Sequence, residues 1–195
     1  VKKKQITHLS NDSPEPLVPH VPGIYMINPS GFIGKMRRVE PVYADLKKGS
    51  FMMQAASMGL MGGMGDARIK GARALIQTTL RSPTFYIYFD ESVPENLRSH
   101  APTIWSSGGG ATIATPQDLD LVKFEQKKGH REARIGKRLK DKHEILFSTE
   151  LLAPGIYRLS VRSHLQPGQY GLVQSVRGND GKGRNSARIF DFEVG

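Results

Sequence analysis

Short segments in which apolar and polar residues alternate recur along the chain, and this pattern predicts β-strands with one buried face. In residues 84–89, aromatic and aliphatic side chains occupy both parities, so both faces of this strand are expected to contact protein. Residues 67–80 also alternate, although a helix fits part of that segment as well. Further strands are predicted at residues 22–27, 36–43, 119–126, 133–135 and 188–194.

Pro-Gly pairs precede several of these segments. Pro fixes φ at the first central position of a tight turn, and Gly takes a positive φ at the next position without a Cβ clash. One pair leads into residues 22–27, and two Pro-Gly-x-Tyr units follow at residues 154–157 and 167–170. Such spacing is typical of antiparallel sandwiches. The predicted fold class is therefore all-β: an antiparallel β-sandwich, immunoglobulin-like or jelly-roll-like, with small helical or irregular insertions.

Shifts in composition divide the chain into four segments. Residues 1–20, rich in Lys, Pro and small polar residues, predict an irregular lead-in. An N-terminal β block is expected at residues 21–90 and a C-terminal β block at residues 117–195. The Gly-, Pro- and Ser-rich residues 91–116 predict a loop that connects them. Because 195 residues fit one large domain or two small ones, we expect the two blocks to share or abut a core.

The chain is basic and contains no cysteine. It has 28 Lys and Arg against 18 Asp and Glu, a formal net charge of +10, which favours acidic partners of any class. Without cysteine, disulfides, thiolate metal sites and thiol catalysis are excluded. No apolar stretch approaches the roughly 20 residues of a membrane-spanning helix. The first residue is Val1 rather than Met, which fits processing, a trimmed chain or a missing leader; removal of a signal peptide would mean export.

Turn and strand motifs recur over most of the chain after Val21. They are residues 72–89, Leu121-Val122-Lys123-Phe124, Lys127-Lys128, Arg131-Glu132, Ile135-Gly136-Lys137, the two Pro-Gly-x-Tyr units and Phe190-Asp191-Phe192-Glu193-Val194. This set resembles an uncharacterised family of exported bacterial β-rich proteins. The resemblance implies a bacterial protein of the periplasm or cell surface, with a sandwich-like fold and no established activity. It assigns no functional residues.

A cluster of methionines lies within residues 52–64. Met58, Met61 and Met64 are spaced by three, and converging thioethers bind Cu(I). These three residues are therefore the candidate metal ligands, and a Met-rich copper-binding periplasmic protein is the alternative function. The other reading is a flexible apolar segment that packs into gaps or against a partner. The glycines between the methionines disfavour a stable helix, because each costs about 1 kcal/mol relative to Ala.

The densest positive charge lies in residues 123–143. From this stretch we predict a surface that binds a protein partner, possibly an acidic one, through Lys127, Lys128, Arg131, Arg134, Lys137 and Arg138. Phosphate backbones also need only such positive density, so binding of nucleic acid or another polyanion is a third hypothesis. Single-strand binding without sequence preference needs aromatic platforms as well, and this stretch offers only Phe124. The single tryptophan, Trp105, is a candidate interface anchor, or else it covers an edge of the core.

No local catalytic motif is present. The six histidines have no metal-ligand spacing, and neither a nucleophile elbow nor a nucleotide fingerprint occurs. We therefore predict no enzyme activity and no cofactor. The predicted function is that of a non-catalytic, exported accessory or structural subunit, which binds protein partners in a bacterial envelope or membrane-associated complex. Homo- or hetero-oligomers are both compatible with this function.

Overall fold

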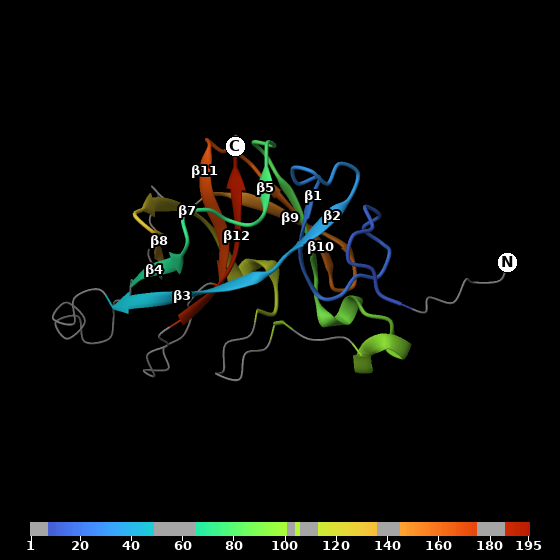
Figure 1. Cartoon of the computed structure of the whole chain (residues 1–195). Coiled ribbons are helices and arrows are strands. Elements are labelled where there is room, and N and C mark those ends of the chain that lie inside the picture. The colour runs from blue at the N-terminus through green and yellow to red at the C-terminus, as the bar shows by residue number, and fades with distance from the viewer. Residues whose placement is uncertain (1–7, 49–64, 101–103, 106–112, 136–144, 175–185) are drawn as a thin grey trace.

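The computed structural model describes residues 8–48, 65–100, 104–105, 113–135, 145–174 and 186–195. Strands make up 52% of the described residues, which contain no α-helix, so the prediction of an all-β protein is confirmed (Figure 1). The strands are β1 Gly23–Ile27, β2 Met36–Val39, β3 Pro41–Lys48, β4 Gly65–Lys70, β5 Gln77–Thr78, β6 Thr84–Tyr88, β7 Leu119–Lys127, β8 His130–Ile135, β9 Phe147–Ala153, β10 Ile156–Val161, β11 Gly168–Gln174 and β12 Ser186–Val194. Short 3₁₀ turns lie at Asp90–Ser92 (η1), Glu95–His100 (η2) and Pro116–Asp118 (η3).

The first of two sheets has five strands, in the order β2-β1-β6-β10-β9. The predicted strand at residues 84–89 is its central strand β6. As expected, both faces of β6 are covered: Phe85 and Ile87 belong to one buried cluster and Tyr86 and Tyr88 to another. The turn before β10 has the predicted conformation, because Gly155 of the Pro-Gly pair adopts a positive φ of +71°. Burial of both faces explains why no polar residue interrupts this strand.

The second sheet closes on itself. Its order is β11-β7-β8-β4-β3-β12, and β12 returns to pair with β11, which makes a closed barrel of six strands. The short strand β5 pairs with β12 in parallel. A sandwich of two open sheets is therefore not confirmed, because one of the two sheets has become a barrel.

Strands β2 and β3 tie the two sheets together. In Figure 1 they form one long ribbon that crosses the molecule. Residues 36–39 pair with β1, whereas residues 41–45 pair with β12. Pro41, which has no N–H to donate, stands where the ribbon leaves the five-stranded sheet. Each sheet thus takes strands from both predicted blocks.

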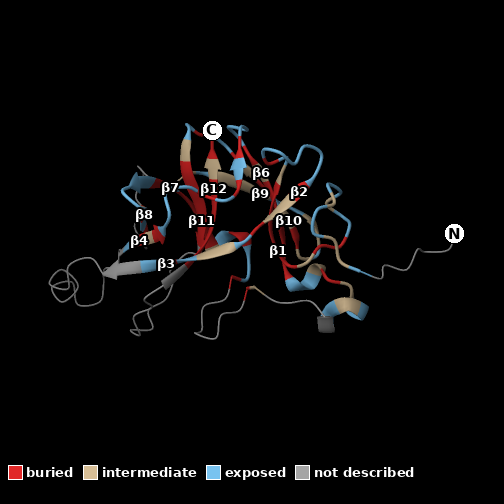
Figure 2. Cartoon of the chain, in the orientation of Figure 1, coloured by how far each residue is buried: buried red, intermediate tan, exposed pale blue. Residues whose placement is uncertain are grey.

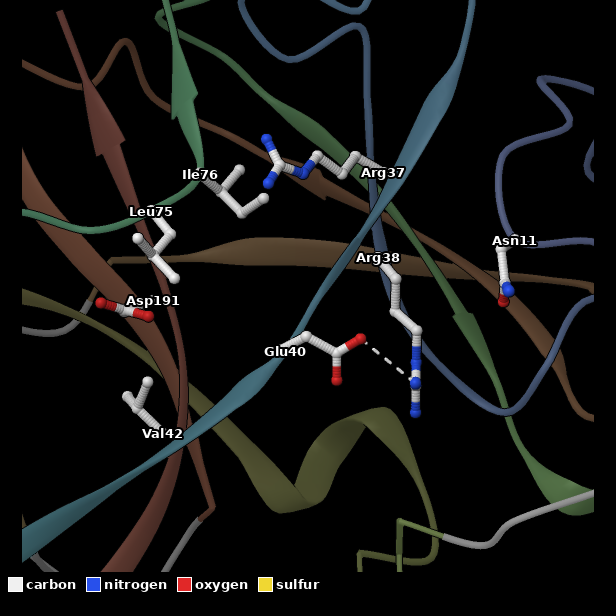
Figure 3. Close-up of a pocket in the computed structure, with 8 residues that line it drawn as sticks. All are labelled: Asn11, Arg37, Arg38, Glu40, Val42, Leu75, Ile76 and Asp191. Atoms are coloured by element: carbon white, nitrogen blue, oxygen red, sulfur yellow. Dashed lines mark hydrogen bonds and ion pairs between the residues drawn. The ribbon is translucent and has the colours of Figure 1, made fainter.

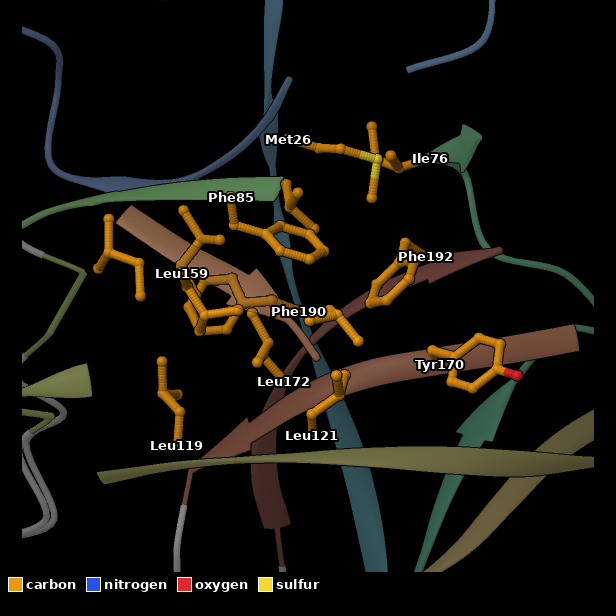
Figure 4. Close-up of a cluster of buried hydrophobic side chains, with 14 of the residues drawn as sticks. Met26, Ile76, Phe85, Leu119, Leu121, Leu159, Tyr170, Leu172, Phe190 and Phe192 are labelled. Atoms are coloured by element: carbon orange, nitrogen blue, oxygen red, sulfur yellow. The ribbon is translucent and has the colours of Figure 1, made fainter. Parts of the chain in front are cut away.

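The main core lies between the five-stranded sheet and the wall of the barrel. Figure 4 shows Phe85 and Leu159 of the sheet facing Leu121, Leu172 and Phe190 of the barrel. Buried residues concentrate on the strands where the two layers meet (Figure 2). Burial of such large apolar side chains is the dominant stabilising contribution in a domain of this size.

The barrel interior holds a second core that combines alanines with larger side chains. Ala44, Ala67 and Ala133 come from the neighbouring strands β3, β4 and β8, and Phe124, Ile135 and Ile189 belong to the same cluster. Gly171 is required there, since a Cβ at this position would lie 2.7 Å from Cγ2 of Ile189 and 3.0 Å from a ring carbon of Phe124. A six-stranded barrel is narrow, and small residues such as these leave room for the larger side chains beside them.

Among the described residues, the structure contains no helix with the length and hydropathy that a membrane-spanning helix needs.

Candidate functional site

The outer edge of β9 presents backbone groups that no described strand pairs with. Antiparallel strands alternate between residues that exchange hydrogen bonds and residues whose N–H and C=O groups point the other way. The N–H of Arg162 donates to the C=O of Leu146 at 3.1 Å, which fixes this alternation along β9. Phe147, Thr149 and Leu151 therefore direct their N–H and C=O groups away from β10. An extended segment from another chain would find a ladder of donors and acceptors here.

Exposed aliphatic side chains accompany this edge. Leu146 is 61% exposed and Leu151 is 60% exposed. Leu151 stands opposite Tyr157, which packs against the main core, yet the side chain of Leu151 itself stays exposed. An ion pair between Arg158 and Glu150 is the only one that joins β9 to β10 among the described residues. The β9 edge thus combines open backbone with an apolar rim.

The opposite edge of the same sheet is occupied by the chain's own N-terminal segment. The N–H of Met36 in β2 donates to the C=O of Asp12 at 3.2 Å, and Lys35 pairs with the Asp12 carboxylate at 3.1 Å. His20, fully buried, stacks on the ring of Tyr88 at 4.3 Å between centroids. Burial lowers the pKa of His20 and raises the pKa of Tyr88. This segment contacts the β2 edge at Met36 and covers the face of the sheet that carries Tyr88, whereas none of the described strands pairs with the outer edge of β9.

A cleft opens where β12 changes partners. Along one edge, β12 pairs with β3 as far as Phe190 and with β5 from Glu193 onward. The two residues in between, 191 and 192, have no strand partner on that edge. The cleft has a volume of about 380 Å³. Figure 3 shows the residues around it, which are Asn11, Arg37, Arg38, Glu40, Val42, Leu75, Ile76 and Asp191.

A buried polar cluster closes the end of the barrel beside this cleft. Arg131 is only 3% exposed, pairs with the carboxylate of Asp191, and donates to the C=O of Gly71 at 3.1 Å. The side-chain oxygen of Gln169 accepts from the N–H of Ala74 at 2.9 Å. These contacts fasten residues 71–74 across the barrel end. Arg131 was predicted to bind a partner, but the structure removes it from that surface because its guanidinium lies inside the barrel.

Three other basic residues of the predicted surface, Lys127, Lys128 and Arg134, lie on the β7–β8 hairpin. Lys127 pairs with Glu125 at 2.8 Å and with Glu132 at 3.8 Å, and the hydrogen bond that Lys127 donates to the Glu125 carboxylate raises the pKa of Lys127. Lys128 and Arg134 are exposed. The neighbouring carboxylates offset part of the positive charge that made this stretch a candidate for polyanion binding.

Two further groups of predicted residues fall outside the described part of the chain. Lys137 and Arg138 of the basic surface lie there, and so do the candidate copper ligands Met58, Met61 and Met64. Among the described residues, no cluster of three or more His, Asp or Glu side chains is arranged to hold a metal ion.

Trp105 lies in the core rather than at the surface. It is 3% exposed, its indole N–H donates to the C=O of Tyr88 at 3.1 Å, and its ring centroid lies 4.8 Å from that of Phe89. Of the two roles considered for Trp105, covering an edge of the core fits this geometry, and an exposed anchor for a partner does not.

The sequence patterns predicted neither the unpaired edge of β9 nor the cleft beside β12. Residues 147–153 were not predicted as a strand. The Pro-Gly turn at residues 154–155 follows them directly and leads into a predicted strand, so they could have been recognised as the first strand of a hairpin. No sequence pattern marked Leu75 or Arg37 as functional residues, because the cleft exists only through the pairing of β12 with two different strands. Pairing between distant strands is not visible in alternation along one strand.

In comparisons with known proteins, no family model, no curated protein and no solved structure matches this chain.

Proposed function

We propose that this protein is a non-catalytic binding subunit that takes up an extended segment of a protein partner along the outer edge of β9. The observation that carries the proposal is the outward direction of the backbone groups of Phe147, Thr149 and Leu151. Edge strands of this kind recruit a further strand through main-chain hydrogen bonds, and adjacent side chains supply specificity.

The side chains of this edge indicate what the partner strand contributes. Leu151 and Leu146 lose exposed apolar surface when a strand is added, and removal of such surface from water favours association by about 25 cal/mol per Å². The partner strand is therefore apolar at the positions opposite these leucines. The net charge of +10 also favours a partner that is acidic beyond the strand itself.

The location of the complex rests on sequence alone. Export to a bacterial periplasm or cell surface, as the resembling proteins suggest, belongs to the proposal. The role in an envelope-associated complex belongs to it for the same reason.

Two substitutions at one position test the proposal. Thr149→Pro removes an outward N–H and places a ring on the edge, while the hydrogen bonds to β10 are kept because residue 149 does not donate toward β10. Thr149→Val keeps the N–H and, like the proline variant, loses the hydroxyl that accepts from Gln117 at 3.4 Å. Any difference between the two variants therefore reports on the backbone edge.

The measurement is retention of companion proteins from an extract of the source cells by the tagged wild-type chain and both variants. We expect the wild type and Thr149→Val to retain the same companion, and Thr149→Pro to retain at least about tenfold less, since 1.4 kcal/mol in binding is tenfold. Denaturation midpoints verify that both variants are folded. Equal retention by Thr149→Pro and Thr149→Val would refute the proposal.

A further inference from the structure

The cleft at the end of the barrel carries one cation for which the described residues provide no ion-pair partner. Arg38 donates to Glu40 at 3.2 Å and to the C=O of Pro22 at 3.1 Å, and Asp191 is paired with Arg131. No carboxylate of the described residues forms an ion pair with Arg37. The cleft thus has an excess of positive charge, and that excess belongs to Arg37.

The guanidinium of Arg37 is held in place before any ligand arrives. Its central carbon lies 4.7 Å from the centroid of the Phe32 ring, a cation–π contact that limits the rotamers of this long side chain. A preorganised guanidinium binds a carboxylate with less loss of conformational entropy than a free one. Figure 3 shows Arg37 pointing from the β2 side of the cleft toward Ile76.

Apolar side chains form the wall that Arg37 faces. Val42 and Ile76 line the cleft, and Leu75 beside them is 84% exposed. A leucine so exposed at the mouth of a recess is apolar surface without a cover in the described structure. The cation and the apolar wall meet in a recess of about 380 Å³, so the ligand must carry an anionic and an aliphatic group close together.

We propose that this cleft binds the C-terminal residue of a partner polypeptide, with the terminal carboxylate on Arg37 and an aliphatic side chain against Ile76 and Leu75. A C-terminal residue carries both groups on one Cα, which is the shortest separation a polypeptide provides; an internal Asp or Glu places its carboxylate farther from a neighbouring aliphatic side chain. Capture of terminal carboxylates is an established mode of peptide recognition. The inference rests on the proposed partner-binding function and adds a second contact to it.

Three blocked peptides test this inference without any knowledge of the partner. The first is acetyl-Gly-Ser-Gly-Leu with a free carboxylate, the second is its C-terminal carboxamide, and the third is acetyl-Gly-Asp-Leu-Gly carboxamide, which carries an internal carboxylate. Binding is followed by NMR chemical shifts of the labelled full chain. We expect the free acid to shift the resonances of Arg37, Leu75 and Ile76 and to bind at least about tenfold more tightly than either carboxamide.

Variants tie the affinity to the named side chains. Arg37→Gln is expected to bind the acid and its carboxamide equally weakly, and Leu75→Ser to weaken both. Arg134→Gln removes an exposed arginine of β8 and serves as the matched control, with affinity like the wild type. The inference is overturned if the acid and its carboxamide bind equally to the wild type, if the internal-Asp peptide binds best, or if Arg134→Gln loses as much affinity as Arg37→Gln.

The two proposals fail separately. Thr149→Pro leaves the cleft intact, so it should bind the free-acid peptide like the wild type even though it loses the companion. If wild-type protein retains a companion through β9 but no peptide shifts the cleft resonances, the proposed function stands and the cleft inference falls.

Discussion

The barrel and the five-stranded sheet deal differently with strand edges. The barrel is closed by the pairing of β11 with β12, and the other edge of β12 lacks a ladder partner at the two residues between its β3 and β5 pairings. The five-stranded sheet stays open: the N-terminal segment contacts its β2 edge at Met36, and its β9 edge is unpaired among the described strands. An edge that the described strands leave unpaired is where contact with other molecules is expected.

The interior of the barrel should be the region least tolerant of change. In Asp191→Ala the guanidinium of Arg131 stays buried without its counter-charge, and we expect a loss of about 3–5 kcal/mol in the free energy of unfolding. Urea denaturation measures this loss. Replacing both partners, as in Arg131→Met with Asp191→Leu, should recover most of it, because no unpaired charge is left. A single-variant loss below about 1 kcal/mol would show that the pair is more hydrated than its burial indicates.

Overpacking of the same interior should have the next largest effect. Gly171→Ala places a methyl group 2.7 Å from Cγ2 of Ile189, and we expect about 1–3 kcal/mol of destabilisation in the same assay. Leu151→Ala at the open edge is the comparison, and it should change stability by less than about 1 kcal/mol since Leu151 is mostly exposed. Equal losses in both variants would abolish the distinction between closed barrel and open edge.

The N-terminal segment packed on the five-stranded sheet should respond to pH through His20. Burial lowers the pKa of His20 below 6.5 in the folded chain, so the unfolded chain binds a proton that the folded chain does not. Stability is therefore full above about pH 6.5 and falls as the pH drops below this value. Denaturation midpoints at pH 7.5 and 5.5 should differ more in the wild type than in His20→Phe, where this linkage is absent. The same pH dependence in both proteins would rule out His20 as its source.

The smallest effect is expected at the open edge itself. Arg158 and Glu150 pair while both are about half exposed, and exposed pairs contribute roughly 0–1 kcal/mol. Glu150→Gln should accordingly leave the denaturation midpoint nearly unchanged, in contrast to Asp191→Ala. A large loss would mean that β9 is held by this ion pair rather than by its hydrogen bonds to β10.

How far the sequence predicts this structure differs from strand to strand. Strands β6 and β12 were predictable because their apolar side chains alternate or fill both faces. The closure of the barrel was not predictable, because the alternation along a strand indicates which side chains share a face but not which strands lie next to it. The burial of Arg131 was missed for a related reason: its partner Asp191 lies 60 residues away, and an arginine in a basic stretch is ordinarily a surface residue. The unpaired edge of β9 became evident only from the strand pairing in the structure.

Amide hydrogen exchange of the chain, alone and with the companion retained from source cells, tests the central claim most directly. In the isolated chain the amides of Phe147, Thr149 and Leu151 should exchange rapidly, while those of Ser148 and Glu150, which face β10, should be protected. In the complex the first three should become protected as well. Fast exchange of all three in the complex, or protection of all three before a companion binds, would contradict strand addition at β9.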